Sequence, residues 1–180
     1  MASQPQGELI QRVRRGDEDA CRRLVATHQP ALYRLARRLL GDAHRAEDVC
    51  QEAFLRTLSR LSKLDGRKPL IHYLRRVATN LCINELRRRR PTVPLNEAMG
   101  VPARRSAASE ARERRLREAV DEALIDLPVH QRVAFVLFHQ EQLGYEGIAE
   151  LTGRPLNTVK SDLHRARRHV GDALRAEGLV

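Results

Sequence analysis

The amino-acid sequence predicts an all-α protein with two small helical domains joined by a flexible linker, the second domain containing a helix-turn-helix. Apolar residues recur at intervals of three and four almost throughout, and the period-two alternation of strands is absent. The periodicity stops between about Pro91 and Ser109, where three prolines, a glycine and small polar residues give the composition of a flexible connection. We therefore expect a first domain at residues 1–90, a linker at 91–111 and a second domain at 112–180.

Three long helices are expected in the first domain, each with one apolar stripe. Gly41 should end the first helix, and a turn at Asp65-Gly66 followed by Pro69 separates the second from the third, which ends in ELRRRR. The stripe of the first helix is Leu32, Leu35, Ala36, Leu39 and Leu40. The second has Val49 or Cys50, Ala53, Phe54, Leu58 and Leu61, and the third has Leu70, Leu74, Val77 and Leu81, with Cys82 at its edge.

In the second domain, two helices are expected on either side of Pro128, which suits the first position of the later one. That later helix carries Val133 and Leu137. The earlier helix has the most regular stripe in the chain, made of Leu116, Ala119, Val120, Ala123, Leu124 and Leu127.

Residues 144–168, GYEGIAELTGRPLNTVKSDLHRARR, read as a short helix, a turn and a second, basic helix. Ile148, Ala149 and Leu151 pack the short helix, Gly153 ends it, and Asn157 is a suitable N-cap for the second. One face of the second helix is Val159, Leu163, Ala166 and Val170; the other is Thr158, Lys160, Ser161, His164, Arg165 and Arg168. A helix in the major groove reads bases with residues near its N-terminus, so this pattern favours DNA binding over a solvated amphipathic helix.

Composition narrows the class of function. The formal net charge of +10 indicates a polyanionic partner such as nucleic acid. No apolar run could span a bilayer and the N-terminus lacks a secretory signal, so we expect a cytoplasmic protein. Cys21, Cys50 and Cys82 share no metal spacing with the seven histidines, which predicts buried free thiols and neither metal nor cofactor. No phosphate loop or catalytic pair occurs at a useful spacing, so an enzyme acting on nucleic acid is not expected.

Two helices of the first domain carry polar faces of opposite character. In RRVATNLCINELRRRR, amide and guanidinium side chains alternate at helical spacing, at Arg76, Asn80, Asn84 and Arg87, and could contact phosphates and base edges. One helix earlier, Glu47, Asp48, Gln51 and Glu52 form an acidic patch. Such a patch repels DNA and suits a basic protein partner.

Three stretches, GDAHRAEDVCQEAFLRTLSRL, HYLRRVATNLCINELRRRR and LPVHQRVAFVLFHQEQLGYEGIAELTGRPLNTVKSDLHRARRHV, occur in this order with the linker between the last two. They resemble the two conserved regions of bacterial RNA polymerase sigma factors of the extracytoplasmic-function class. The resemblance covers most of residues 20–90 and 115–172. It departs from the family pattern at Tyr73, where Trp is common, and at Thr79, where Arg is common.

The resemblance implies a non-enzymatic protein that binds the RNA polymerase core and directs it to promoters. It is expected to be a monomer when not bound to polymerase and a possible target of an anti-sigma factor. The resemblance implies that Asp48, Gln51, Glu52 and Leu55 dock on the β′ clamp. It also implies that Tyr73, Arg76, Asn80, Asn84 and Arg87 read and help to melt the minus-ten element. The second domain lies on the β flap and reads the minus-thirty-five element through Arg154, Asn157, Thr158, Lys160, Ser161, His164, Arg165 and Arg168.

Tyr73 has two possible roles, stacking on a base or serving as a half-buried aromatic residue. For the whole chain, the alternative is a stand-alone helix-turn-helix regulator that binds duplex DNA as a dimer, which predicts a stable dimer and a palindromic site.

Overall fold

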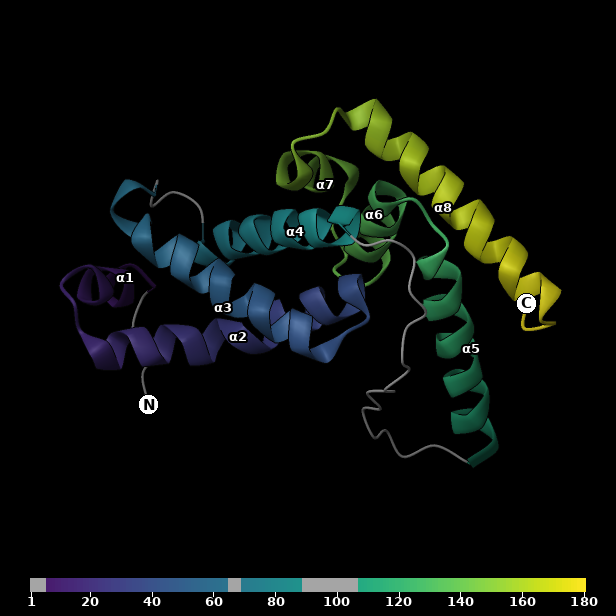
Figure 1. The fold of residues 1–180 in the computed structure, drawn as a ribbon, viewed down its shortest axis with the longest axis horizontal. Coiled ribbons are helices and arrows are strands. Elements are labelled where there is room, and N and C mark those ends of the chain that lie inside the picture. Colours follow the sequence, from purple (N-terminus) through teal and green to yellow (C-terminus); the bar gives the residue numbers. More distant parts are fainter. Residues whose placement is uncertain (1–5, 65–68, 89–106) are drawn as a thin grey trace. The chain divides into compact units, whose positions relative to one another are not determined.

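The computed structural model describes residues 6–64, 69–88 and 107–180, and all regular elements within them are helices. The chain divides into a first unit, Met1–Arg88, and a second unit, Arg89–Val180. The first unit contains α1 (Gln6–Arg14), α2 (Glu18–Leu40), α3 (Ala43–Ser59), the 3₁₀ helix η1 (Leu61–Lys63) and α4 (Leu70–Arg88). The second contains α5 (Ala107–Ile125), α6 (Val129–His139), α7 (Tyr145–Thr152) and α8 (Leu156–Ala176). The all-α prediction is confirmed (Figure 1).

Local signals define the turn between α2 and α3. Gly41 adopts φ 71°, a left-handed conformation that favours glycine, and its N–H donates to the carbonyl of Arg37, which ends α2 as expected. Asp42 then caps α3 because its side chain accepts a hydrogen bond of 3.2 Å from the backbone N–H of Arg45. The two helices therefore reverse direction within two residues.

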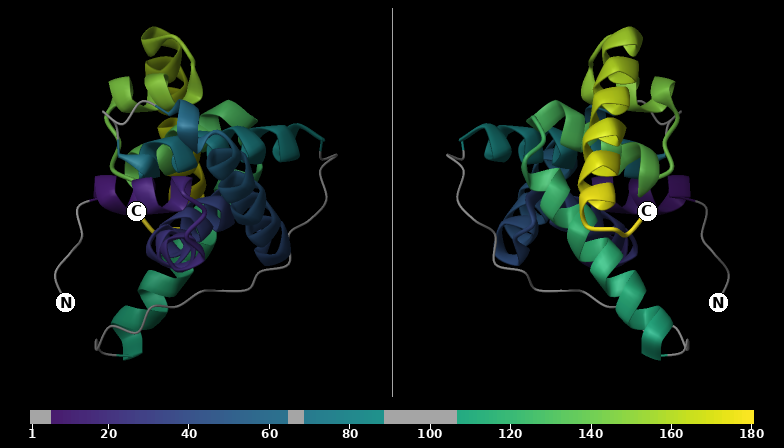
Figure 2. Two further views of the ribbon diagram at one scale, coloured as in Figure 1. Left: turned by 90° about the vertical axis from the view of Figure 1, so that its left-hand side faces the viewer. Right: turned by 90° about the vertical axis from the view of Figure 1, so that its right-hand side faces the viewer.

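The helical structure begins earlier than the sequence indicated. The apolar stripe predicted only residues 31–40 of α2, whereas α2 starts at Glu18, after the cap Asp17, and continues through Pro30. Helix α1 was not predicted. It packs across α2, and the left view of Figure 2 looks nearly along the axis of α2. A salt bridge of 2.8 Å between Arg12 and Asp17 joins the two helices.

The core of the first unit lies between α2, α3 and α4, which pack against one another. The predicted stripe of α2 is buried, and so are Val49, Cys50, Ala53 and Phe54 of α3. The stripe predicted for α4 was wrong at Val77 and Leu81, which are partly exposed, and on α3 Thr57 is buried rather than Leu58. Because α4 packs against both α2 and α3, its buried surface is wider and rotated. It consists of Leu70, Leu74, Ala78, Thr79, Cys82, Ile83 and Leu86.

In the second unit, α8 packs against α5, α6 and α7. Its predicted apolar face, Val159, Leu163, Ala166 and Val170, is buried. Helix α5 begins at Ala107, inside the range expected for the linker, because its alanine-rich start favours a helix. The rest of the expected linker, 91–106, lies outside the described residues, as does the turn at Asp65-Gly66. Pro128 immediately precedes α6 instead of being its first residue.

Candidate functional site

The exposed face of α3 combines acidic groups with one aliphatic side chain. Glu47, Asp48 and Gln51 are exposed, and Glu52 is partly exposed with an ion pair of 2.6 Å to Arg56. Leu55, one turn further along the same face, is 64% exposed. The structure thus brings together the four residues predicted for polymerase docking. The opposite side of α3 is fixed in the core, so this face cannot turn inward. A large aliphatic side chain in water beside carboxylates suits a partner with apolar and basic groups.

The polar face of α4 is also exposed and continuous. Arg76, Asn80, Asn84 and Arg87 are all exposed, over a length of about 16 Å along the helix axis. Tyr73, at the start of this row, is partly buried. The structure therefore brings the predicted minus-ten residues together on one face. Thr79 points away from that face: it is 0% exposed and its hydroxyl lacks a hydrogen-bond partner.

An ion pair fixes α3 against α4. The guanidinium of Arg45, near the start of α3, lies 2.6 Å from a carboxylate oxygen of Glu85 on α4 and 3.4 Å from Asp42. At the other end of the bundle, Arg14 of α1 donates to the carbonyl of Leu61 at 2.9 Å. The Arg45–Glu85 ion pair helps to hold the acidic face of α3 and the polar face of α4 in a constant relation within the first unit. The sequence alone did not indicate the Arg45–Glu85 and Arg14–Leu61 contacts, because each joins residues that are distant along the chain.

The exposed face of α8 carries most of the residues predicted to read duplex DNA. Lys160, Ser161, His164, Arg165 and Arg168 are exposed and Thr158 is partly exposed. Arg168 is 3.9 Å from Asp172 in an exposed pair. The face of α8 that packs in the core is apolar except for Asp162, which is 8% exposed. The arrangement presents hydrogen-bond donors near the N-terminal half of a helix, the half that helix-turn-helix proteins place against base edges.

Two predicted DNA contacts have a different setting from the one expected. Asn157 is not the N-cap: α8 begins at Leu156 after Pro155, with no side-chain cap, so Asn157 lies within the first turn and is exposed. Proline brings a φ suited to a helix start, which moved the boundary two residues earlier than the Asn signal suggested. Arg154 directs its guanidinium to Asp162 at 2.8 Å, and its side chain is only 27% exposed. Its backbone N–H bonds the carbonyl of Ala149, just after Gly153 at φ 69° ends α7 as predicted.

A cluster that sequence reasoning missed joins α6 to α8. The guanidinium of Arg167 stacks over Phe138 at 4.4 Å, and its Nε donates a hydrogen bond of 3.1 Å to Nε2 of His139. Burial, and then the charge of Arg167, lower the pKa of His139 below its usual value. On the other side of α6, Arg132 donates to the carbonyl of Leu124 at 2.6 Å and so satisfies the end of α5.

The three cysteines differ in exposure. Cys50 and Cys82 are buried, and Cys21 is partly buried. Burial is the main cause that raises the pKa of Cys50 to about 11, with a smaller contribution from Glu47. Burial raises the pKa of Cys82 as well. Nowhere in the described ranges do three or more His, Cys, Asp or Glu side chains gather in a way that could hold a metal ion.

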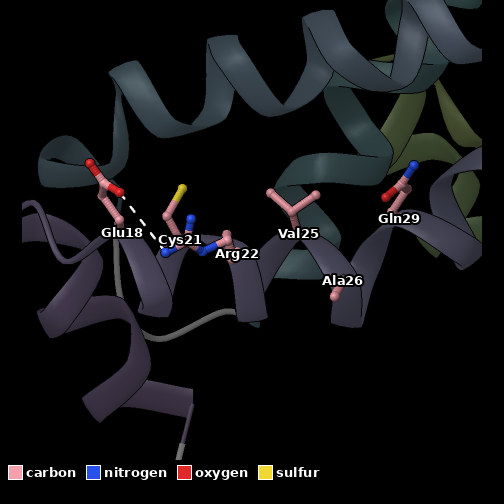
Figure 3. Close-up of a pocket in the computed structure, with 6 residues that line it drawn as sticks. All are labelled: Glu18, Cys21, Arg22, Val25, Ala26 and Gln29. Carbon is pink, nitrogen blue, oxygen red and sulfur yellow. Dashed lines mark ion pairs between the residues drawn. The ribbon is translucent and has the colours of Figure 1, made fainter.

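A shallow hollow of about 470 Å³ lies on α2 (Figure 3). Its lining residues all belong to that helix: Glu18, Cys21, Arg22, Val25, Ala26 and Gln29. One end carries an exposed ion pair of 3.9 Å between Glu18 and Arg22. This combination offers no converging polar groups that would orient a small ligand, so we assign the hollow no function. Among the helices that the structure describes, none has the length and apolar character that crossing a membrane would require.

The chain matches two protein-family models. Sigma-70 region 2 matches residues 24–92, and Sigma-70, region 4 matches residues 117–170. The ECF RNA polymerase sigma factor SigW of Bacillus subtilis is 30% identical over 177 residues, which are 92% of this chain and 95% of SigW. The RNA polymerase sigma-H factor of Pseudomonas aeruginosa is 34% identical over 179 residues, 93% of each protein. The sigma factor RpoE of Bartonella quintana, solved with the anti-sigma factor NepR, has a similar fold, with a TM-score of 0.66, 20% identity and coverage of 86% of this chain and 96% of RpoE.

Proposed function

The chain belongs to the extracytoplasmic-function class of bacterial RNA polymerase sigma factors, and we propose that its three exposed faces divide the work of polymerase docking and promoter recognition. As a member of this family it binds the RNA polymerase core and directs promoter-specific initiation of transcription. The alternative of a stand-alone dimeric regulator is not favoured, because the family match includes the first unit as well as the helix-turn-helix.

The acidic face of α3 is proposed to dock on the β′ clamp. The observation that carries this proposal is the exposure of Leu55. Its side chain is 64% exposed and lies on the same face as Asp48, Gln51 and Glu52. Covering the remaining apolar surface of a leucine of this exposure is worth about 1–2 kcal/mol, or roughly a 5- to 30-fold gain in affinity. Flanking carboxylates orient the encounter with a basic partner and repel DNA.

The polar face of α4 is proposed to bind the minus-ten element. Asn80 and Asn84 offer both donors and acceptors to base edges, and Arg76 and Arg87 offer guanidinium groups to phosphates. Tyr73, partly buried at the start of this face, could stack on an unpaired base with the exposed part of its ring.

The second unit is proposed to lie on the β flap and to read the minus-thirty-five element as duplex. The exposed donors of α8, Lys160, Ser161, His164 and Arg165, would enter the major groove, and Thr158 and Arg168 would flank them. Asn157, exposed in the first turn, can reach the same groove. Arg154 would support the reading helix through Asp162.

The remaining partners follow from the same assignment. A protein that works on RNA polymerase acts in the cytoplasm, without catalysis of its own. We propose that it is a monomer when not bound to polymerase. We also propose that an anti-sigma factor holds it inactive by covering these exposed faces. The sigma factor RpoE, of similar fold, was solved in complex with an anti-sigma factor, NepR.

A binding experiment tests the docking assignment. Leu55→Asp, and separately Asp48→Arg with Glu52→Arg, should each weaken binding to the core polymerase at least 10-fold while the helical circular-dichroism signal is unchanged. Val180→Asp is a matched control, because Val180 is another aliphatic residue exposed to 70% and lies outside the proposed face. Undiminished core binding by the Leu55 variant would overturn the assignment of this face.

A further inference from the structure

Helix α2 has an unbalanced charge that none of the faces described above uses. Between Asp19 and Asp42 the chain contains five arginines and no carboxylate. Two of these arginines, Arg34 and Arg38, are exposed and lie one helical turn apart on the same side of α2. Neither belongs to the faces of α3 and α4 proposed above.

The C-terminal end of α2 lies at the same end of the first unit as that of α4. The three helices of the bundle reverse direction at each turn, so α2 and α4 run the same way (Figure 1). We define the basic end as residues 34–45 and 85–88. It contains six arginines and two carboxylates, those of Asp42 and Glu85. The basic end therefore has an excess of positive charge.

Stabilisation of the helix C-termini explains the positions of some of these arginines but not of all. Arg37 and Arg38 lie in the last turn of α2, and Arg87 and Arg88 lie in the last turn of α4, where cations stabilise the helix terminus. Arg34 lies before that last turn and is exposed. Several like charges at one end of a small unit repel one another, and a bound polyanion removes that repulsion.

We propose that the basic end binds the sugar-phosphate backbone of duplex DNA adjoining the segment that α4 reads. This inference rests on the proposed function of α4, because a promoter that lies along its polar face reaches the basic end at Arg87, which belongs to both surfaces. Guanidinium groups match phosphate geometry. A duplex carries one charge per about 1.7 Å of axis and a single strand half that density, so clustered arginines gain most from a duplex. The contact holds the promoter in register and reads no sequence.

The test uses holoenzyme assembled from the full chain and core polymerase, with promoter binding measured over a series of salt concentrations. Arg34→Ala with Arg38→Ala should reduce the slope of log affinity against log salt by about 2, because each lost phosphate contact contributes about 0.9. The loss should be equal for promoters that differ in sequence. Arg22→Ala with Arg23→Ala is the matched control, since it removes the same charge from the other half of α2. Arg34→Lys with Arg38→Lys should keep most of the slope.

Each outcome separates this proposal from the function proposed for α4. An unchanged slope in the Arg34 and Arg38 double variant, or an equal change in the control, overturns the basic end as a DNA contact. A loss of core binding in place of promoter affinity overturns it too and assigns the surface to the polymerase. In the same assay Asn80→Ala should alter sequence preference. If Asn80→Ala leaves sequence preference unchanged while the Arg34 and Arg38 double variant lowers the salt slope, the assignment of α4 fails and the phosphate contact of the basic end stands.

Discussion

Replacing Arg154 by Ala should destabilise the second unit more than replacing its partner Asp162 by Ala. The two side chains form an ion pair of 2.8 Å between the turn and α8, and their exposure differs: 27% for Arg154 and 11% for Asp162. Removing Arg154 leaves a carboxylate in the core without its counter-ion. Removing Asp162 leaves a guanidinium on a long stem that can reach water.

The magnitudes follow from this asymmetry. Breaking a fully buried pair costs about 3–5 kcal/mol, and partial exposure lowers that figure, so we expect about 2–3 kcal/mol for Arg154→Ala. For Asp162→Ala we expect about 1 kcal/mol, since the Nε of Arg154 is already buried without a hydrogen-bond partner and the pair is imperfect. The double variant should cost less than the sum of the two single variants, with a coupling of about 1–2 kcal/mol.

Hydrogen exchange read by mass spectrometry can assign the loss to one unit. Peptides from α7 and α8 should exchange about 25- to 150-fold faster in Arg154→Ala, and peptides from α2 to α4 serve as the internal reference. Asp172→Ala is a control that breaks two exposed ion pairs, with Arg175 at 2.6 Å and with Arg168 at 3.9 Å, and it should change exchange little. Additive costs, or a cost for Arg154→Ala no larger than for Asp162→Ala, would refute the reasoning.

Four further predictions concern single features. Thr79→Val should raise the stability of the first unit by about 1 kcal/mol in urea denaturation, because it removes a buried hydroxyl without a partner; a loss would contradict this. Asn157→Ala should change the free energy of unfolding by less than about 0.5 kcal/mol in urea denaturation, because Asn157 lies in the first turn of α8 and does not cap it. Loss of a true N-cap would cost about 0.5–2 kcal/mol. A thiol reagent at pH 8 should modify Cys21 much faster than Cys50, whose pKa is raised to about 11, and equal native rates would be inconsistent with that burial. Folding lowers the pKa of His139, so the stability that its neutral form contributes is present above about pH 6.5 and is lost as the pH falls below that value. The free energy of unfolding should therefore fall less between pH 7.5 and pH 5 in His139→Gln than in the parent protein.

The features predicted correctly from the sequence depend on neighbouring residues. The face of α8 follows from a four-three-four spacing of apolar residues, and Gly41 and Gly153 end their helices because φ near 70° favours glycine. The exposed rows on α3 and α4 were predictable for the same reason, since helical periodicity alone decides which side chains share a face. That Leu55 remains 64% exposed could not be read from periodicity, because burial depends on which helices are its neighbours.

The features that were missed depend on tertiary contacts or on competing local signals. Pro30 lies inside α2, where packing of the apolar stripe outweighs the hydrogen bond that a proline cannot donate. The buried surface of α4 is rotated because two helices cover it, and an amphipathic pattern assumes one covering surface. The ion pair of Arg154 was missed because nothing in a single sequence shows that Asp162, eight residues later, faces inward beside it.

The acidic face of α3 and the polar face of α4 lie on neighbouring packed helices, so their distance relative to the Debye length decides how strongly their charges interact. The axes of packed helices are about 8–10 Å apart, and side chains that point away from the core add further distance. At physiological salt the Debye length is about 8 Å, so the carboxylates of α3 only weakly oppose phosphates bound along α4. The separation requires that neither helix rotates, and the buried surfaces of α3 and α4 together with the Arg45–Glu85 ion pair prevent such rotation. The apolar core of the first unit therefore also keeps the proposed protein-binding face of α3 and the proposed DNA-binding face of α4 on separate sides of the packed helices.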